Sequence, residues 1–271
     1  MYRLVALDVD GTLLDSQHQL RPATVAAVQR VLAQGVHVCV ATGKLFVSAQ
    51  AHIRELGLVG PQITCNGAAI INSPDGALLA HEPLTPAALA LALDALASHA
   101  PNIAVAWYTT DTIYTNAAPG WLDTVLARYH EPPLRHVAQL DSTLPAPVKL
   151  LVAGEDAALD ALRAAVAPQL AGKVQTIRTT VDFLEFLNLD VDKGSALRRV
   201  MALLGIPAAE VVAIGDGEND ISMIESAGLG VAMGNAIPAL VAKADWRTTT
   251  HDEGGVAHAL DIIFSELSRR G

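Results

Sequence analysis

The sequence predicts an α/β fold, in which a doubly wound parallel sheet carries an inserted α+β domain. Two observations lead to this prediction. In the first and last parts of the chain, short apolar runs alternate with segments of helical spacing, which is the order of a parallel sheet. In the middle part, strand-like runs follow one another in pairs, as in antiparallel structure. With 51% hydrophobic residues in a chain of 271, a sizeable core can be buried.

The first and last parts of the chain together supply the parallel sheet. In the first part we expect a strand over 4–7, a helix over 22–32, a strand over 36–41, a helix from 42–44 to 56, a strand over 62–65 and a hairpin of 69–71 with 77–79. In the last part we expect a helix over 192–204, a strand over 211–215, a helix to 227, a strand over 228–233, a short helix over 238–242 and a helix over 254–267. The strands are short apolar runs bounded by turn residues, as buried parallel strands are.

The middle part breaks this alternation. There we expect a helix over 85–99, strands over 103–108 and 112–115, a helix over 120–129, a strand over 148–153, a helix over 155–167 and strands over 174–178 and 182–187. Thr85 before Pro86 is a typical helix start, with a hydroxyl cap followed by proline at the first position. The sequence therefore predicts a Rossmann-like core made of 1–83 and 188–271, with an α+β domain inserted over 84–187.

Composition and charge exclude several classes of function. The formal net charge is −10 and the isoelectric point about 5.3, which argues against binding to duplex nucleic acid or an anionic membrane. Neither CxxC nor HExxH spacing occurs, so a zinc site is not expected. Cys39 and Cys65 lie in apolar runs and are expected to be buried free thiols. The early first strand leaves no room for a signal peptide, and the longest apolar helical stretch, 87–97, is too short to span a bilayer. We therefore expect a soluble cytoplasmic protein.

Two carboxylates follow the first apolar run directly. Asp8 and Asp10 are one residue apart, and Gly11 and Thr12 come after them. In open α/β sheets, ligands bind outside the carboxyl ends of the strands, which is where these acids would lie. In an extended chain both would point the same way, and two like charges at that distance repel one another. The pair therefore predicts a divalent metal, an acid–base role, or both.

Other polar groups stand at strand ends or helix starts. They are Asp8 with Asp10, Thr42 with Gly43, Lys193, and Asp216 with Asn219 and Asp220. These residue types suit phosphoryl transfer, which needs a metal, positioning and charge stabilisation. Asp8 and Asp216 could hold Mg²⁺, which prefers carboxylate oxygens. Thr42 and Gly43 could bind an anion at a helix N-terminus, and Lys193 would add a positive charge.

Each of these groups also has a purely structural interpretation. The acids of the first run could mark a strand end before a helix cap, and Thr42 could cap a helix. Lys193 could be a solvated lysine on a helix. Asn219 could donate to a phosphate oxygen. Their joint occurrence, each at the appropriate end of an element, favours the functional interpretation.

At this point the sequence resembles a known family. The residues that carry the resemblance are Asp8-Val9-Asp10-Gly11-Thr12-Leu13, Ala41-Thr42-Gly43-Lys44, Lys193-Gly194 and Gly215-Asp216-Gly217-Glu218-Asn219-Asp220. They are similar to the four motifs of the haloacid dehalogenase-like hydrolases. The Cof-type subclass (IIB), whose α/β cap lies between the second and third motifs, is the most similar, and the segments 64–68 and 230–236 also resemble it. The resemblance covers essentially the whole chain and is only architectural in the cap.

The resemblance implies a mechanism. Asp8 would attack phosphorus and form an aspartyl phosphate, while Asp10 would protonate the leaving alkoxide and then deprotonate the hydrolytic water. Mg²⁺ would bind the Asp8 carboxylate, the Asp10 backbone carbonyl and Asp216. Asp220 would orient Lys193 or a metal-bound water. The residues expected to bind phosphate are Val9, Thr42, Gly43, Lys193 and Asn219.

Two further positions are expected to support the site. The family often has arginine where Lys44 stands, and lysine lacks the bidentate fork of arginine. Lys44 would either contact the substrate, and so change the preference for it, or be a solvated lysine in the first turn of a helix. Asn66 is expected to face the entrance of the site.

The leading hypothesis is a Mg²⁺-dependent phosphatase that hydrolyses phosphomonoesters of small metabolites, such as sugar phosphates or phosphorylated cofactors. The cap would close over the core and select the leaving group. The alternatives are a phosphomutase on the same scaffold and a non-catalytic phosphoacceptor or phospholigand-binding protein. The acid–base residue next to the nucleophile argues against the last of these. The oligomeric state stays open between a monomer and a weak dimer.

Overall fold

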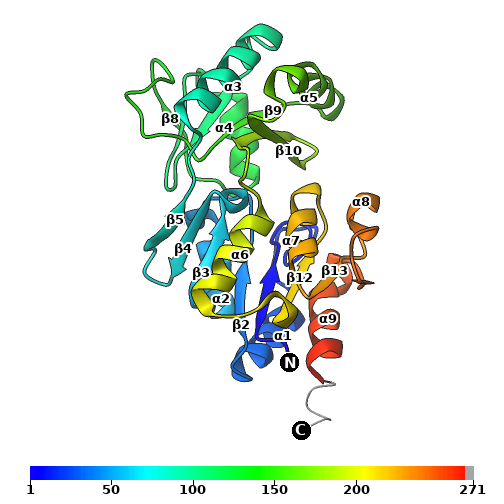
Figure 1. The fold of residues 1–271 in the computed structure, drawn as a ribbon. Helices are drawn as coiled ribbons and strands as arrows, with labels where there is room; N and C mark the ends of the chain where they lie inside the picture. The colour runs from blue at the N-terminus through cyan, green and yellow to red at the C-terminus, as the bar shows by residue number, and fades with distance from the viewer. Residues whose placement is uncertain (266–271) are drawn as a thin grey trace.

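A computed structural model describes residues 1–265 of the chain. It has two parts: a parallel sheet flanked by helices, and a second sheet with its own helices placed at one end of the first part (Figure 1). The chain leaves the first part after β5 and returns to it at α6. The predicted α/β class, with a doubly wound core and an inserted α+β unit, is therefore confirmed.

The core sheet has its first strand next to its last ones, in the order β14-β13-β12-β1-β2, and all these pairs are parallel. The strands are β1 (Leu4–Leu7), β2 (His37–Val40), β12 (Val211–Gly215), β13 (Leu229–Ala232) and β14 (Trp246–Arg247). β1 pairs with β2 on one side and with β12 on the other, so that Leu4 lies opposite both His37 and Val211. Residues from the two ends of the chain therefore meet at the middle of one sheet.

Helices cover both faces of this sheet. They are α1 (Pro22–Ala33), α2 (Phe46–Leu56), α6 (Lys193–Leu204), α7 (Ile221–Ser226), α8 (Pro238–Val241) and α9 (Gly255–Ser265), with short 3₁₀ turns at Ala208–Glu210, Glu218–Asp220 and His251–Glu253. Successive residues of a strand point to opposite faces. Val5 and Leu7 pack with α1, α2 and α9, whereas Leu4 and Ala6 pack with α6, α7 and α8. This alternation explains why β1 is apolar throughout.

A three-stranded antiparallel sheet continues from β2. It comprises β3 (Gly60–Thr64), β4 (Ala69–Ser73) and β5 (Leu78–His81), with a 3₁₀ turn over Cys65–Gly67. A single parallel bridge between Ala41 and Ile63 links it to the core sheet. The turn after β3 therefore lies near the end of β2, beside the segment that begins at Thr42.

The inserted unit is a six-stranded sheet in the order β10-β11-β9-β6-β7-β8, antiparallel except for the pair β7–β8. Its elements are α3 (Pro86–His99), β6 (Val105–Tyr108), β7 (Ile113–Thr115), α4 (Trp121–Arg128), β8 (Arg135–His136), β9 (Lys149–Ala153), α5 (Asp156–Leu170), β10 (Val174–Thr180) and β11 (Phe183–Asn188). One face packs against α3 and α5. The other face packs against α4 and against Leu45, Cys65 and Ala68 of the core.

Most expected elements are present, and the differences are informative. The helix expected from Thr42 begins instead at Phe46, because the intervening residues form a loop in which the Lys44 amide donates to the Thr42 hydroxyl. The two-residue strands β8 and β14 were not predicted, since so short a run has no readable periodicity. Both cysteines are buried and free, as predicted. The end of the last predicted helix, 266–267, lies outside the described residues, and the domain boundaries at 84 and 187 stay predictions.

Within residues 1–265, no helix combines the length and the apolar character needed to cross a membrane.

Candidate active site

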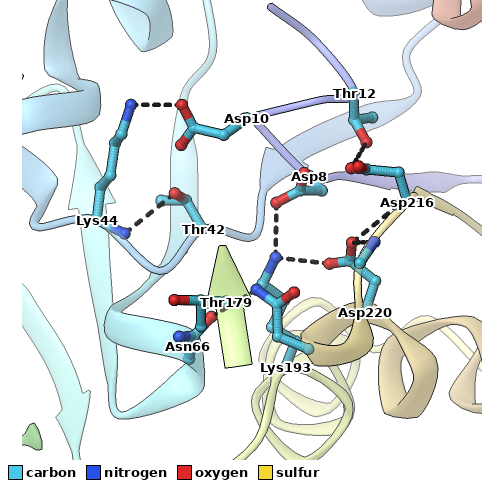
Figure 2. A network of polar contacts seen from close by, with 12 residues as sticks. Asp8, Asp10, Thr12, Thr42, Lys44, Asn66, Thr179, Lys193, Asp216 and Asp220 are labelled. Carbon is cyan, nitrogen blue, oxygen red and sulfur yellow. Dashed lines mark hydrogen bonds and ion pairs between the residues drawn. The ribbon is translucent and has the colours of Figure 1, made fainter. Parts of the chain in front are cut away.

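The predicted acids meet at the carboxyl ends of β1 and β12. Asp8 follows the last residue of β1, and its backbone amide donates to the Ile214 carbonyl of β12 at 3.0 Å. Asp216 follows the last residue of β12. Because neighbouring parallel strands end at the same edge, two residues distant in the sequence lie close together (Figure 2).

Three carboxylates form a tight cluster around one lysine. Each of Asp8, Asp216 and Asp220 has a carboxylate oxygen within 4.8 Å of one from each of the others. Lys193 Nζ, fully buried at the start of α6, donates to Asp8 Oδ1 and to Asp220 Oδ1, each at 2.6 Å. The interpretation of Lys193 as a solvated helix lysine is therefore wrong, because its ammonium is enclosed between two acids (Figure 2).

Asp220 is held in place by backbone groups as well as by the lysine. Its Oδ2 accepts from the amides of Asp216 and Gly217 at 3.0 and 2.9 Å, while Oδ1 accepts from Lys193. Both oxygens thus have partners within the chain. The backbone thus fixes one oxygen of Asp220 while the other contacts Lys193, as expected if Asp220 orients the lysine.

The cluster carries more negative than positive charge, and burial raises the pKa values of its acids. The pKa of Asp8 lies well above its usual range because the group is buried and lies close to Asp220, although Lys193 acts in the opposite direction. Burial and then Asp220 raise the pKa of Asp216 to about 7. Burial acts to lower the pKa of Lys193, but the charges of Asp220 and Asp8 outweigh it and leave the pKa raised. An additional cation would relieve this repulsion.

The donor set suits a hard divalent cation. Asp8 and Asp216 offer carboxylate oxygens at one edge of the sheet, which are the ligands that Mg²⁺ prefers. Asp216 is oriented by two residues for which the sequence suggested no role. Thr12 Oγ1 donates to Asp216 Oδ1 at 2.9 Å, and Asn235 Nδ2 lies 3.3 Å from Oδ2 and donates to the Gly11 carbonyl at 2.8 Å. Thr12 and Asn235 both lie in segments that resemble the family (8–13 and 230–236), and that position could have indicated a role in the site.

Gly11 allows Asp216 to approach the first loop. Its φ is +84°, and a Cβ at this position would collide with the Asp216 carboxylate. We expect Gly11→Ala to lower the free energy of unfolding by about 1–2 kcal/mol, because alanine is strained at positive φ. It should also weaken Mg²⁺ binding, measured by calorimetry, because Asp216 must move. Gly205→Ala is the matched control, since Gly205 has φ +62° and open space around it. Equal Mg²⁺ affinity in the two variants would contradict the prediction.

Asp10 lies apart from the cluster and has its own lysine. Lys44 Nζ donates to Asp10 Oδ1 at 2.7 Å, and His18 Nδ1 lies 3.7 Å from the same oxygen. The strand ends at Leu7 and the chain turns at once, so Asp8 and Asp10 have different partners (Figure 2). Lys44 is only 5% exposed and lies in the loop before α2, so the interpretation as a solvated first-turn lysine is wrong.

The other predicted residues lie around the same space, with one correction. Asn66 was expected at the entrance, but it is fully buried, with Nδ2 2.7 Å from Glu185 Oε2 of the inserted unit. Asn219 Nδ2 donates to Asn66 Oδ1 at 2.9 Å. Thr42 is buried beside Lys44, in a loop rather than at a helix N-terminus. Val9 packs its side chain into the apolar core of the sheet.

A pocket lies between the two units above these residues. Its walls include Asp8, Asp10, Gly43, Lys44, Asp216 and Asn219 from the core, and Tyr129, Glu131, Lys149, Thr179, Phe183 and Glu185 from the inserted unit. The inserted unit therefore supplies one wall of the space over the acids. None of these wall residues of the inserted unit was singled out from the sequence, since each lies in a segment with no motif.

The chain is similar to known proteins along almost its whole length. A family profile described as haloacid dehalogenase-like hydrolase matches residues 5–260. Putative phosphatase YxeH of Bacillus subtilis is 31% identical, over 96% of this chain and 97% of its own. HMP-PP phosphatase of Serratia proteamaculans is 32% identical, over 89% and 86%. A crystal structure of a haloacid dehalogenase-like hydrolase from Bacteroides thetaiotaomicron has a TM-score of 0.84 and 30% identity, covering 97% of this chain and 100% of that one.

The chain belongs to the haloacid dehalogenase-like hydrolases. A subclass IIB sugar phosphatase, 19% identical, shares the fold with a TM-score of 0.81, covering 96% of this chain and 98% of that one. The family predicted from the motifs is therefore confirmed, and so is the predicted enzyme class, a phosphatase of this family. The inserted unit lies between the second and third motifs, where the resemblance predicts a cap, and is called the cap below.

Proposed function

We propose that the protein is a Mg²⁺-dependent phosphatase that hydrolyses phosphomonoesters of small metabolites through an aspartyl-phosphate intermediate. The observation that carries the proposal is the separation of the two acids in the first loop. Asp8 belongs to the cluster with Asp216 and Lys193, whereas Asp10 stands outside it with Lys44. This separation supports a nucleophilic role for Asp8, beside metal and phosphate, and a proton-transfer role for Asp10.

In this mechanism a carboxylate oxygen of Asp8 forms a bond to phosphorus while the bond from phosphorus to the ester oxygen breaks. Asp10 gives its proton to the departing alkoxide. Asp10, now ionised, takes a proton from water as the water oxygen attacks the phosphorus of the aspartyl phosphate, and the Asp8 carboxylate is regenerated. Both carboxyl groups line the pocket between core and cap, as these steps require.

The metal would be held by the Asp8 carboxylate, Asp216 and the backbone carbonyl of Asp10. When bound, Mg²⁺ supplies positive charge that lets an anionic nucleophile meet an anionic phosphate. Thr12 and Asn235 would keep Asp216 in position for it. The cluster of Asp8, Asp216 and Asp220 is a group of acids that could hold such a cation.

The phosphate oxygens would be held by the side chains of Lys193, Thr42 and Asn219, and by backbone groups of Val9 and Gly43. Lys193 is suited to this because an ammonium has three N–H donors, of which Asp8 and Asp220 accept two, and because its raised pKa keeps it charged. Asp220 would orient it.

The substrate would be a small phosphorylated metabolite whose leaving group contacts the cap wall of the pocket. The names of the relatives, HMP-PP phosphatase and sugar phosphatase, support phosphorylated cofactors and sugar phosphates as the classes to test first. Lys44, which lies beside Asp10 on the core side of the pocket, would contact the substrate.

The experiment is a panel of phosphomonoesters assayed with Mg²⁺ for release of inorganic phosphate. We expect hydrolysis that stops when Mg²⁺ is chelated. Conversion of a hexose phosphate into an isomer without phosphate release would instead identify a phosphomutase. A stable phosphorylated protein with no release of phosphate would identify a phosphoacceptor.

Replacing Asp10 with asparagine should lower kcat by about 10²–10⁴-fold, because proton transfer to the alkoxide is lost. Mg²⁺ affinity should change less than about 2-fold, since the proposed metal ligand of this residue is its backbone carbonyl. Asp216→Asn is the comparison, because it removes a carboxylate ligand and should weaken Mg²⁺ binding. Calorimetric titration of both variants measures this, and equal losses of Mg²⁺ affinity would refute the division of roles.

A further inference from the structure

A buried ion pair in the cap contacts the core, and both of its residues line the same pocket as the carboxylate cluster. Lys149 begins β9 and Glu185 lies in the neighbouring strand β11. They are 1% and 2% exposed, and Lys149 Nζ lies 2.7 Å from Glu185 Oε1. Buried charges need hydrogen bonds beyond the one that joins them. Of their remaining partners, Gly43 and Asn66 belong to the core, whereas Tyr108 and Thr179 belong to the cap.

Lys149 reaches the loop after β2. Its Nζ donates to the Gly43 backbone carbonyl at 2.7 Å, and it lies 4.3 Å from the centre of the Tyr108 ring, at cation–π distance. Glu185 reaches the turn after β3, where Oε2 accepts from Asn66 Nδ2 at 2.7 Å. The ion pair thus binds two separate core segments.

Asn66 also contacts the loop after β12. Its Oδ1 accepts from Asn219 Nδ2 at 2.9 Å. A carboxylate only accepts, so Glu185 requires the Nδ2 end of Asn66, which turns Oδ1 toward Asn219 and selects the Nδ2 end of the Asn219 amide. A Cβ on Gly43 would lie 3.0 Å from Asn66 Nδ2, so Gly43, at one end of this series, also packs against Asn66. The series starts and finishes at residues proposed to bind phosphate.

We propose that Lys149 and Glu185 of the cap position Gly43 and Asn219, the latter through Asn66, so that the phosphate-binding groups are arranged only while the cap lies on the core. This inference rests on the proposed function, in which Gly43 and Asn219 hold phosphate. Lys149 and Glu185 are positioning residues in it. The cap would then prepare the core for phosphate in addition to forming a wall of the pocket.

The test is a double-mutant cycle on the binding of inorganic phosphate to the Mg²⁺-loaded protein, measured by calorimetry and as product inhibition. Glu185→Gln should weaken phosphate binding about 10-fold or more, because glutamine cannot accept from both Lys149 and Asn66. Asn219→Ala should also weaken it. In the Asn219→Ala background, Glu185→Gln should add a smaller factor than it does in the parent protein, since the part of its effect that goes through Asn66 requires Asn219. A structural role alone would lower stability and give independent effects.

Two further variants make the result decisive. Lys149→Met combined with Glu185→Gln leaves no unpaired buried charge, and it should weaken phosphate binding as Glu185→Gln does, even if the single variant folds poorly. Arg163→Gln breaks a different contact between cap and core, in which Arg163 donates to Glu218 at 2.9 and 2.5 Å, and it should change phosphate binding less than 2-fold.

The outcomes separate the inference from the proposed function. Independent effects of Glu185→Gln and Asn219→Ala, or an equal loss in Arg163→Gln, would overturn the positioning role and leave the phosphatase mechanism intact. Unchanged phosphate binding in Asn219→Ala would instead overturn the proposed role of Asn219, and the inference would fall with it.

Discussion

Asp8→Asn should abolish phosphate release, lowering kcat by on the order of 10⁴-fold or more, because the amide cannot serve as the nucleophile. Asparagine keeps the size of the side chain, and its Oδ1 can still accept from Lys193, so the fold should persist. The measurement is turnover of the best substrate of the panel, with thermal unfolding as the check on folding.

Asp261→Asn is the matched control for this change. Asp261 is exposed on α9 and pairs with Arg30 at 2.6 Å, so the same chemical substitution occurs far from the pocket. Its turnover should equal that of the parent protein. Full turnover in Asp8→Asn would refute the assignment of the nucleophile, whatever the result with the other acids.

Lys193→Met should lower the free energy of unfolding by about 3–5 kcal/mol, because it leaves two buried carboxylates without their shared counter-charge. Asp8 and Asp220 each lie 2.6 Å from the lysine, whose side chain is fully buried. Urea denaturation without metal measures the loss. Turnover should also fall, since Lys193 is proposed to hold phosphate.

Lys243→Met is the control for the lysine. Lys243 pairs with Glu225 at 2.7 Å, but its side chain is 53% exposed, and surface pairs contribute at most about 1 kcal/mol. If the two variants lose the same stability, the cluster does not depend on Lys193 for its charge balance. Mg²⁺ should restore part of the stability of Lys193→Met, since a ligand that binds only the folded state stabilises it.

The main features of the site could be predicted because the ends of buried strands can be recognised in the sequence. Asp8 and Asp216 each follow an apolar run, and parallel strands end at a common edge, so their proximity follows from local patterns. The helix start predicted at Thr42 was wrong, because the local pattern there did not determine the structure. A hydroxyl before glycine is typical of a helix cap, and only contacts with the Lys44 amide and the neighbouring turn show that a loop intervenes.

The cap contribution could not be predicted. Lys149 and Glu185 lie in apolar strands, and their significance comes from partners 106 and 119 residues away, at Gly43 and Asn66. No spacing rule connects such positions. Asn66 was expected at the entrance, but it is buried against Glu185 of the cap, a contact that no pattern near residue 66 indicates.

The order of the core strands has a consequence for how the protein is made. β1 is synthesised first, yet its neighbour β12 comes after the whole cap, and Thr12 is 204 residues from its partner Asp216. Closing so long a loop is a late and slow event in folding. A nascent chain that has not reached β12 holds Asp8, Asp10 and Lys193 but lacks Asp216, and one edge of β1 stays open to wrong pairing. Catalytic competence and protection from aggregation should therefore arrive together, once β12 has been synthesised.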